Sequence, residues 1–286
     1  MKSLELLFSL LLLLSGASST PYYNEAYQEP YAWVEETHLI AHAFGGIEDY
    51  SYTNSLEAFL QNYEKGQRVF EVDFSFSSEG TLVAAHDWSS FYTMTGLTPS
   101  APELDAPSLA EFSQATIYGE YTPLTWEQIA WLMVFFPDMY VVTDTKYTTE
   151  PMITDAFTQI VDVAIDVNPA ILDRVIPQIY NNDMYISISE IHPWQSVIYT
   201  LYGQTIEEFS YDNVLEFVED NEIKVVTTFP ARSDLTFIQQ VQELGCAVYM
   251  HTFNDTIQVE KYIDSHQIQG VYTDFLLPED VDHLFD

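Results

Sequence analysis

The chain has 286 residues, of which 44 are Asp or Glu and only 8 are Lys or Arg, so its formal net charge is −36. This charge repels phosphate backbones and anionic bilayers, and no basic amphipathic segment offsets it. We therefore expect no nucleic-acid partner and no stable membrane insertion. A site for an anionic substrate must then supply its own positive charge.

The first segment has the features of an export signal. In MKSLELLFSLLLLLSGASST, Lys2 precedes an apolar run through Leu14, and small residues follow around Ala17. The run is too short to span a bilayer, and the small residues are typical of a cleavage site. We predict a signal peptide over 1–19, a polar, tyrosine-rich leader over 20–36 and one domain over 37–286. The protein is then secreted, with retention at the cell surface as the alternative.

Beyond the leader, strand-like apolar runs alternate with helix-like stretches. Strands are expected at 38–42, 68–76, 81–86, 139–146, 174–180, 196–202, 223–229, 247–253 and 270–276. Helices are expected at 54–66, 124–136, 152–165, 205–220, 234–245 and 256–266. Thr125 and Gln128 have the spacing of a capping box at the start of the second helix. Such alternation indicates parallel strands with helical crossovers, either a barrel or a doubly wound sheet.

The stretch between the second and third expected strands breaks this alternation. The Ser77–Gly80 turn leaves no room for a helix, because a parallel crossover needs about a dozen residues or more. One of the nine strand candidates must be spurious or lie outside an eight-stranded ring, and we expect a distortion here. The segment 89–121, rich in Ser, Thr, Pro and Gly, is predicted to be a loop insertion after the third strand.

Polar residues gather at the ends of the early strands, where α/β barrels place their chemistry. Glu71 and Asp73 lie two apart on one strand and so share a face, where buried charges need a partner or a metal. His42 and His86 end the first and third strands, and Asp144 and Lys146 share a face of the fourth. Two histidines, three carboxylates and one lysine together predict a metal-assisted acid–base site.

Several motifs in a fixed order carry a family resemblance. They are AHAFGG, TNSLEAF, FEVDFSFSSEGTLVAAHDW, TPLTWEQI, VVTDTK, VYMHTFND and GVYTDFLLPED. Their order and spacing resemble the glycerophosphodiester phosphodiesterase family, TIM barrels that hydrolyse glycerol-based phosphodiesters. The resemblance implies a single TIM (β/α)8 barrel, distorted around strands 2 and 3, with an insertion after strand 3. The implied partner is a small-molecule glycerophosphodiester or a lysolipid headgroup, and no protein partner is inferable.

The resemblance also implies roles for individual residues. His42 and His86 match the catalytic general base and acid, and Lys146 matches the lysine that faces the substrate phosphate. The implied metal ligands are Glu71, Asp73 and Asp144. All-carboxylate ligands suit Ca²⁺ or Mg²⁺ rather than zinc, so one such divalent cation is the expected cofactor.

Substrate contacts are expected from the strand near the C-terminus. Asn254 matches a motif position there, and His251 replaces the family's tryptophan and could reach the mouth of the pocket. Three further departures stand out: Ala43 replaces an arginine, Thr53 replaces a glutamate, and Asp144 replaces the usual glutamate. Two alternatives therefore stay open. One is a phospholipase D-like or lyase enzyme that forms a cyclic phosphate from lysophospholipids or sphingolipids, and the other is a non-catalytic binding barrel.

Overall fold

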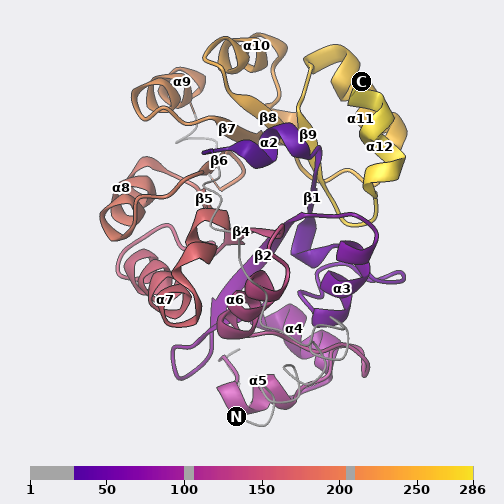
Figure 1. The fold of residues 1–286 in the computed structure, drawn as a ribbon, viewed down its shortest axis with the longest axis vertical. Helices are drawn as coiled ribbons and strands as arrows, with labels where there is room; N and C mark the ends of the chain where they lie inside the picture. The colour runs from indigo at the N-terminus through magenta and orange to yellow at the C-terminus, as the bar shows by residue number, and fades with distance from the viewer. Residues whose placement is uncertain (1–28, 100–105, 204–209, 286) are drawn as a thin grey trace.

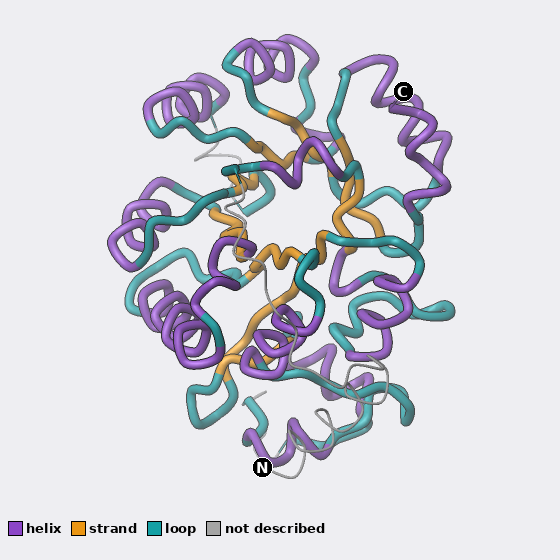
Figure 2. The backbone as a smooth tube through the Cα atoms, viewed as in Figure 1, coloured by secondary structure: helices purple, strands orange, loops and turns teal. Residues whose placement is uncertain are grey.

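The centre of the fold is a closed ring of eight parallel strands in a computed structural model that describes residues 29–99, 106–203 and 210–285 (Figures 1 and 2). The ring closes because β1 pairs with both β2 and β9. This is the expected TIM barrel. Its strands are β1 Leu39–Ala41, β2 Val69–Phe76, β4 Tyr140–Asp144, β5 Val175–Ile179, β6 Ile198–Thr200, β7 Val225–Thr228, β8 Ala247–Met250 and β9 Gly270–Thr273.

The ninth strand lies outside the ring, as the short turn before it requires. Strand β3 (Leu82–Ala84) pairs antiparallel with the end of β2, with Phe74 opposite Ala84. Gly80 lies in the connecting turn at φ 81°, a left-handed conformation that glycine adopts without strain. The expected distortion around the second and third strands is therefore confirmed.

Helices cover the outside of the ring (Figure 1). The six expected helices are observed as α3 Leu56–Glu64, α6 Trp126–Phe135, α7 Met152–Val167, α9 Tyr211–Asp220, α10 Leu235–Glu243 and α11 Thr256–His266. The capping box of Thr125 and Gln128 is present. Outside the leader and the insertion, two further helices were not predicted, α8 Asn182–Ile191 and α12 Pro278–Phe285. Short 3₁₀ segments at His42–Phe44, Pro169–Arg174 and Pro230–Arg232 complete the connections.

The insertion after β3 is not the plain loop that its composition predicts. It contains α4 (Trp88–Thr95) and α5 (Leu109–Gln114). Asp87 caps α4 by accepting from the backbone N–H of Ser90 at 2.8 Å. The rings of Phe91 and Phe112 stack with centroids 5.0 Å apart and are fully buried. Two buried aromatic anchors thus outweigh a composition rich in turn-forming residues.

The end of the predicted leader folds onto the barrel. Helix α2 (Ala32–Glu36) lies across one end of the ring, and Trp33 is 1% exposed with its ring centroid 5.6 Å from that of Tyr249 (Figure 1). The predicted signal peptide, 1–19, lies outside the described residues. Within the described part of the chain, no helix is both long and apolar enough to cross a membrane.

Side chains fill the ring in alternation with those that face the helices. The inner layer consists of Ile40, Val69, Tyr140, Val142, Ile176, Ile198, Val225, Tyr249 and Tyr272. Because Val69 points inward, the two-residue period of β2 also points Glu71 and Asp73 inward. The same period carries Asp144 inward from Val142 on β4. The strand pattern alone therefore directs three carboxylates into the barrel.

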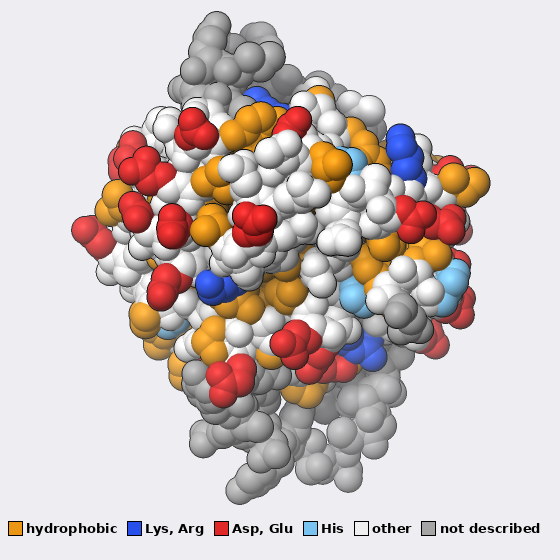
Figure 3. Space-filling view, turned by 90° about the horizontal axis from the view of Figure 1, so that it is seen from above, with side chains coloured by type: hydrophobic (Ala, Val, Ile, Leu, Met, Phe, Trp, Pro, Cys, Tyr) orange, Lys and Arg blue, Asp and Glu red, His pale blue; other side chains and the backbone are white. Residues whose placement is uncertain are grey.

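The surface matches the composition. The face seen in Figure 3 carries scattered Asp and Glu side chains and few Lys or Arg, as expected for a chain of net charge −36.

Candidate active site

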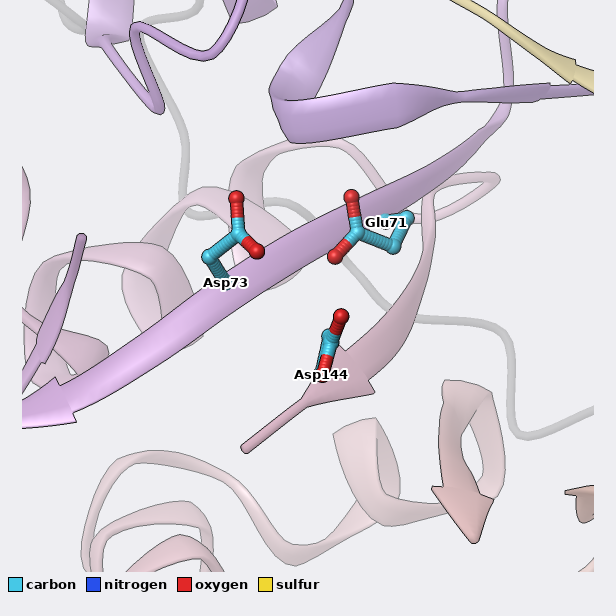
Figure 4. Close-up of side chains that lie close together, drawn as sticks. All are labelled: Glu71, Asp73 and Asp144. Atoms are coloured by element: carbon cyan, nitrogen blue, oxygen red, sulfur yellow. The ribbon is translucent and has the colours of Figure 1, made fainter. Parts of the chain in front are cut away.

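Three buried carboxylates meet at one end of the barrel (Figure 4). Parallel pairing places Asp73 of β2 opposite Asp144 of β4, one pleat beyond Glu71. One oxygen from each of the three carboxylates lies within 4.8 Å of the others, and the three residues are 1%, 0% and 4% exposed for Glu71, Asp73 and Asp144. The expected metal ligands are therefore brought together.

Nearby positive charge compensates Asp73 but not Glu71. Burial raises the pKa of Glu71 well above its ordinary value, and the charge of Asp73 raises it further. Burial also acts to raise the pKa of Asp73, but Lys146 and His42 lower it below its ordinary value. The Oε1 atom of Glu71 is buried and finds no hydrogen-bond donor among the described residues. An all-oxygen donor set with an unpartnered buried oxygen fits a hard divalent cation.

Lys146 supplies positive charge beside the acidic group. Its ammonium donates a hydrogen bond to Asp73 and lies 3.3 Å from Oδ2 of Asp144. Burial acts to lower its pKa, but Asp144 and Asp73 raise the pKa above the ordinary lysine value, so the side chain stays charged. Lys146 is the second residue after β4 and has φ at 56°, a left-handed backbone that turns the chain at the rim.

His42 is anchored by a carboxylate from the far end of the chain. Its Nδ1 lies 2.9 Å from Oδ1 of Asp274, and its Nε2 lies 3.9 Å from Oε2 of Glu71. Burial acts to lower the pKa of His42, but the hydrogen bond to Asp274 and the charges of Glu71 and Asp73 raise it to about 9. Asn254 donates to the other oxygen of Asp274 at 2.8 Å. Asn254, expected to bind substrate, therefore lies behind His42 and is not part of the cavity wall.

His86 has a carboxylate partner of its own. Its Nδ1 lies 2.7 Å from Oδ2 of Asp87, the residue that also caps α4. Burial acts to raise the pKa of Asp87, but hydrogen bonds from Ser90 and His86 lower it to about 2. The ring of Tyr52 stands edge-on between the histidines, with centroids 4.5 Å from His42 and 5.2 Å from His86. Tyr52 therefore contacts both histidines.

A set of polar side chains from β5, β6 and β9 completes the site. Sequence reasoning missed Gln178, Tyr180, Tyr202 and Tyr272. Tyr180 and Tyr202 donate to the two oxygens of Asp144, the latter at 2.6 Å. They could have been predicted from their positions at or just beyond the C-terminal ends of barrel strands, where α/β barrels place their functional residues. Burial and then the charge of Asp144 raise the pKa of Tyr202 well above its ordinary value, so its hydroxyl keeps its proton.

His251, expected near the mouth of the pocket, is part of the cavity wall just after β8. Its ring stacks on Tyr272 and meets Tyr202 edge-on, with both centroids 4.6 Å away. Its Nε2 is buried and has no partner among the described residues. Burial and then the charge of His42 lower the pKa of His251 to about 3, so the imidazole is neutral near pH 7.

These groups surround one cavity of about 220 Å³. The wall is formed by His42, Tyr52, Glu71, Asp73, His86, Asp144, Lys146, Gln178, Tyr202, Phe229, His251, Thr252 and Tyr272. Among these lining residues Lys146 is the one Lys or Arg. Seven of the eight predicted site residues therefore line one cavity of the barrel, and three of them form a carboxylate group that could hold a metal ion.

The chain belongs to the glycerophosphoryl diester phosphodiesterase family, whose model matches residues 45–277 and so begins just after His42. The family resemblance seen in the motifs, and the enzyme class that it implies, are thereby confirmed. No sequence among the curated proteins matches the chain significantly.

Solved structures share the fold. A protein from Silicibacter pomeroyi, described as a glycerophosphoryl diester phosphodiesterase, superposes with a TM-score of 0.70 at 13% identity. The match covers 87% of this chain and 92% of that one. A phosphodiesterase from Oleispira antarctica, solved with its product sn-glycerol-3-phosphate, gives a TM-score of 0.70 at 18% identity and covers 91% and 100%. A glycerophosphodiester phosphodiesterase from Parabacteroides distasonis gives 0.65 at 16% identity and covers 86% and 96%.

Proposed function

We propose that the protein is a secreted, metal-dependent phosphodiesterase that hydrolyses glycerophosphodiesters to glycerol phosphate and an alcohol. The observation that carries the proposal is the arrangement around one cavity of three buried carboxylates and two histidines, each histidine bonded to its own carboxylate. Family membership supports the reaction class, and the product bound to the Oleispira antarctica relative supports the substrate class. The signal-like sequence at 1–19 supports secretion.

The carboxylates would hold the cation. Glu71, Asp73 and Asp144 present oxygen ligands to a shared point, and oxygen ligands favour Ca²⁺ or Mg²⁺. When bound, such a cation polarises a phosphoryl oxygen and offsets the charge of the transition state, a contribution of roughly several kcal/mol. Lys146, already charged, binds a non-bridging phosphate oxygen.

The histidines move the protons. One of His42 and His86 accepts the proton of the attacking hydroxyl, and the other donates a proton to the oxygen that leaves phosphorus. Asp274 and Asp87 orient the two imidazoles through Nδ1, which leaves each Nε2 for the reaction. With water as the nucleophile, one P–O bond forms and the P–O bond to the alcohol breaks.

Two further residues shape the cavity for substrate. The neutral ring of His251, with its unpartnered Nε2, can exchange a hydrogen bond with a substrate hydroxyl. Asn254 acts indirectly, because its amide donates a hydrogen bond to Asp274 and so holds Asp274 against His42.

The test is hydrolysis of glycerophosphocholine by the purified protein with added Ca²⁺ or Mg²⁺, followed by phosphorus NMR. We expect glycerol phosphate, loss of turnover with a chelator, and loss of turnover in His42→Ala. His283→Ala, an exposed histidine on α12, is the matched control and keeps its activity. A cyclic phosphate as the final product from lysophospholipid would identify the lyase alternative. Binding without turnover under any of Ca²⁺, Mg²⁺ or Mn²⁺ would identify a binding barrel.

A further inference from the structure

Two tyrosines outside the predicted site hold the carboxylate of Asp144. Tyr202, just after β6, donates its hydroxyl to Oδ2 of Asp144 at 2.6 Å. Tyr180, just after β5, donates its hydroxyl to Oδ1. Asp144 is 4% exposed and Tyr180 is 2% exposed, so the bond between these two does not compete with bulk water. One tyrosine just after β5 and one just after β6 therefore both bond the carboxylate of Asp144.

The two tyrosine hydroxyls lie 3.5 Å from each other, and the directions of their bonds to other groups follow from Asp144. An ionised carboxylate can only accept, so the single proton of each tyrosine points at Asp144. Tyr202 must then accept from Nε2 of Gln178, which lies 2.8 Å away. Oε1 of Gln178 accepts in turn from the hydroxyl of Tyr272 at 2.8 Å. Tyr180 accepts from the backbone N–H of Lys146 at 3.3 Å.

This arrangement excludes proton donation to substrate by the two tyrosines and supports a role in orienting Asp144. Because both hydroxyl protons are committed to Asp144, neither tyrosine is free to act as a proton donor to substrate. Two donors on opposite oxygens fix the rotation of the carboxylate. The ammonium of Lys146 also lies 3.3 Å from Oδ2, and one oxygen of Asp144 lies within 4.8 Å of an oxygen from Glu71 and one from Asp73.

We propose that Tyr180 and Tyr202 are positioning residues that orient Asp144 as a metal ligand, with Gln178 and Tyr272 holding Tyr202 in place. The inference rests on the proposed function, since it assumes that the carboxylate group binds a divalent cation. Partners of this kind, placed behind the ligands of a metal, typically contribute about 10–100-fold in affinity.

Calorimetric titration of the protein with Ca²⁺ or Mg²⁺ alone tests the proposal. We expect Tyr180→Phe and Tyr202→Phe each to raise the Kd about 10-fold or more. Tyr249→Phe is the matched control, because it removes an equally buried hydroxyl that donates to the backbone oxygen of Thr37 at the opposite end of the barrel. It should lower Tm while leaving the Kd unchanged.

A double-mutant cycle separates the proposal from a general loss of structure. In an Asp144→Asn background, Tyr202→Phe should cause no further loss of metal affinity. Excess metal should restore the turnover of Tyr202→Phe but not that of a misfolded protein. Kd values within twofold of wild type in both tyrosine variants would overturn the inference. A wild-type protein that binds neither cation would instead overturn the proposed metal site.

Discussion

Replacing Glu71 by Gln should stabilise the metal-free protein while removing its response to metal. Glu71 is 1% exposed, its Oε1 has no donor among the described residues, and Asp73 repels its charge. The amide removes that charge and can still accept the backbone N–H of Ala43, which lies 2.8 Å from Oε2. A buried polar group left unpaired costs about 1–3 kcal/mol, so we expect a gain of that order.

The sign of the pH dependence follows from the raised pKa of Glu71. Folding favours the protonated acid, so the cost of Glu71 is absent below its unfolded pKa of about 4.3 and grows as the pH rises through that value. The advantage of Glu71→Gln should therefore be small near pH 4 and larger at pH 7.

Thermal unfolding in chelator at several pH values measures this effect. For a domain of this size each kcal/mol shifts Tm by about 2–4 °C. Wild type should gain about 2.7 kcal/mol when free metal reaches about 100 times its Kd, and Glu71→Gln should gain none. Glu127→Gln, on the exposed face of α6, is the control and should change neither quantity. A metal-free Glu71→Gln protein less stable than wild type would refute the reasoning, because it would show that His42 and Lys146 already compensate the charge.

Three further predictions concern the cavity wall. Lys146→Met should raise KM about 10–100-fold in a steady-state assay, because hydrogen bonds to charged groups contribute about 1.5–3 kcal/mol. Asp87→Ala should lower stability by about 1 kcal/mol through loss of the α4 cap and should lower kcat, whereas Asp87→Asn should keep the cap and lose mainly kcat. His251→Phe should flatten the fall in stability between about pH 6.5 and pH 3, because the pKa of His251 is about 3 when folded, so below about pH 6.5 only the unfolded state gains the proton.

Each of these predictions has an outcome that would contradict it. An unchanged KM in Lys146→Met would mean that the ammonium serves Asp73 and Asp144 alone. If Asp87→Asn and Asp87→Ala lost equal kcat and had equal stability, Asp87 would not stabilise the protein by capping α4. For His251→Phe, unfolding by urea across the pH range should change slope by at most about 1.4 kcal/mol per pH unit, and an unchanged slope relative to wild type would show that the ring protonates in the folded protein.

The sequence alone determined the alternation of strands and helices and the part of the site that belongs to single strands. Side chains two apart on a strand share a face whatever the tertiary context, so Glu71 and Asp73 could be assigned together. The short Ser77–Gly80 turn indicated a distortion, while the antiparallel pairing with β2 shows that β3 is the strand outside the ring. These features depend on local backbone geometry, which neighbouring residues set.

The sequence was misleading where long-range packing overrode local composition. The insertion was expected to be a loop, yet the buried contact of Phe91 with Phe112 holds two helices there. Helix α8 was missed because its Ser and β-branched residues are weak helix formers, although Met184 and Ile188 bury one face of it. Tertiary burial decided both cases.

Only the tertiary structure decided which partner each catalytic group receives. Asp274 reaches His42 across 232 positions of sequence because β1 and β9 pair, with Ala41 opposite Thr273. Tyr202 reaches Asp144 across 58 positions because β4, β5 and β6 are consecutive in the ring. No local pattern encodes such pairs, since they follow from strand order, register and closure of the barrel. The residue types of the site could thus be predicted from the sequence, while their hydrogen bonds and charges depend on closure of the barrel.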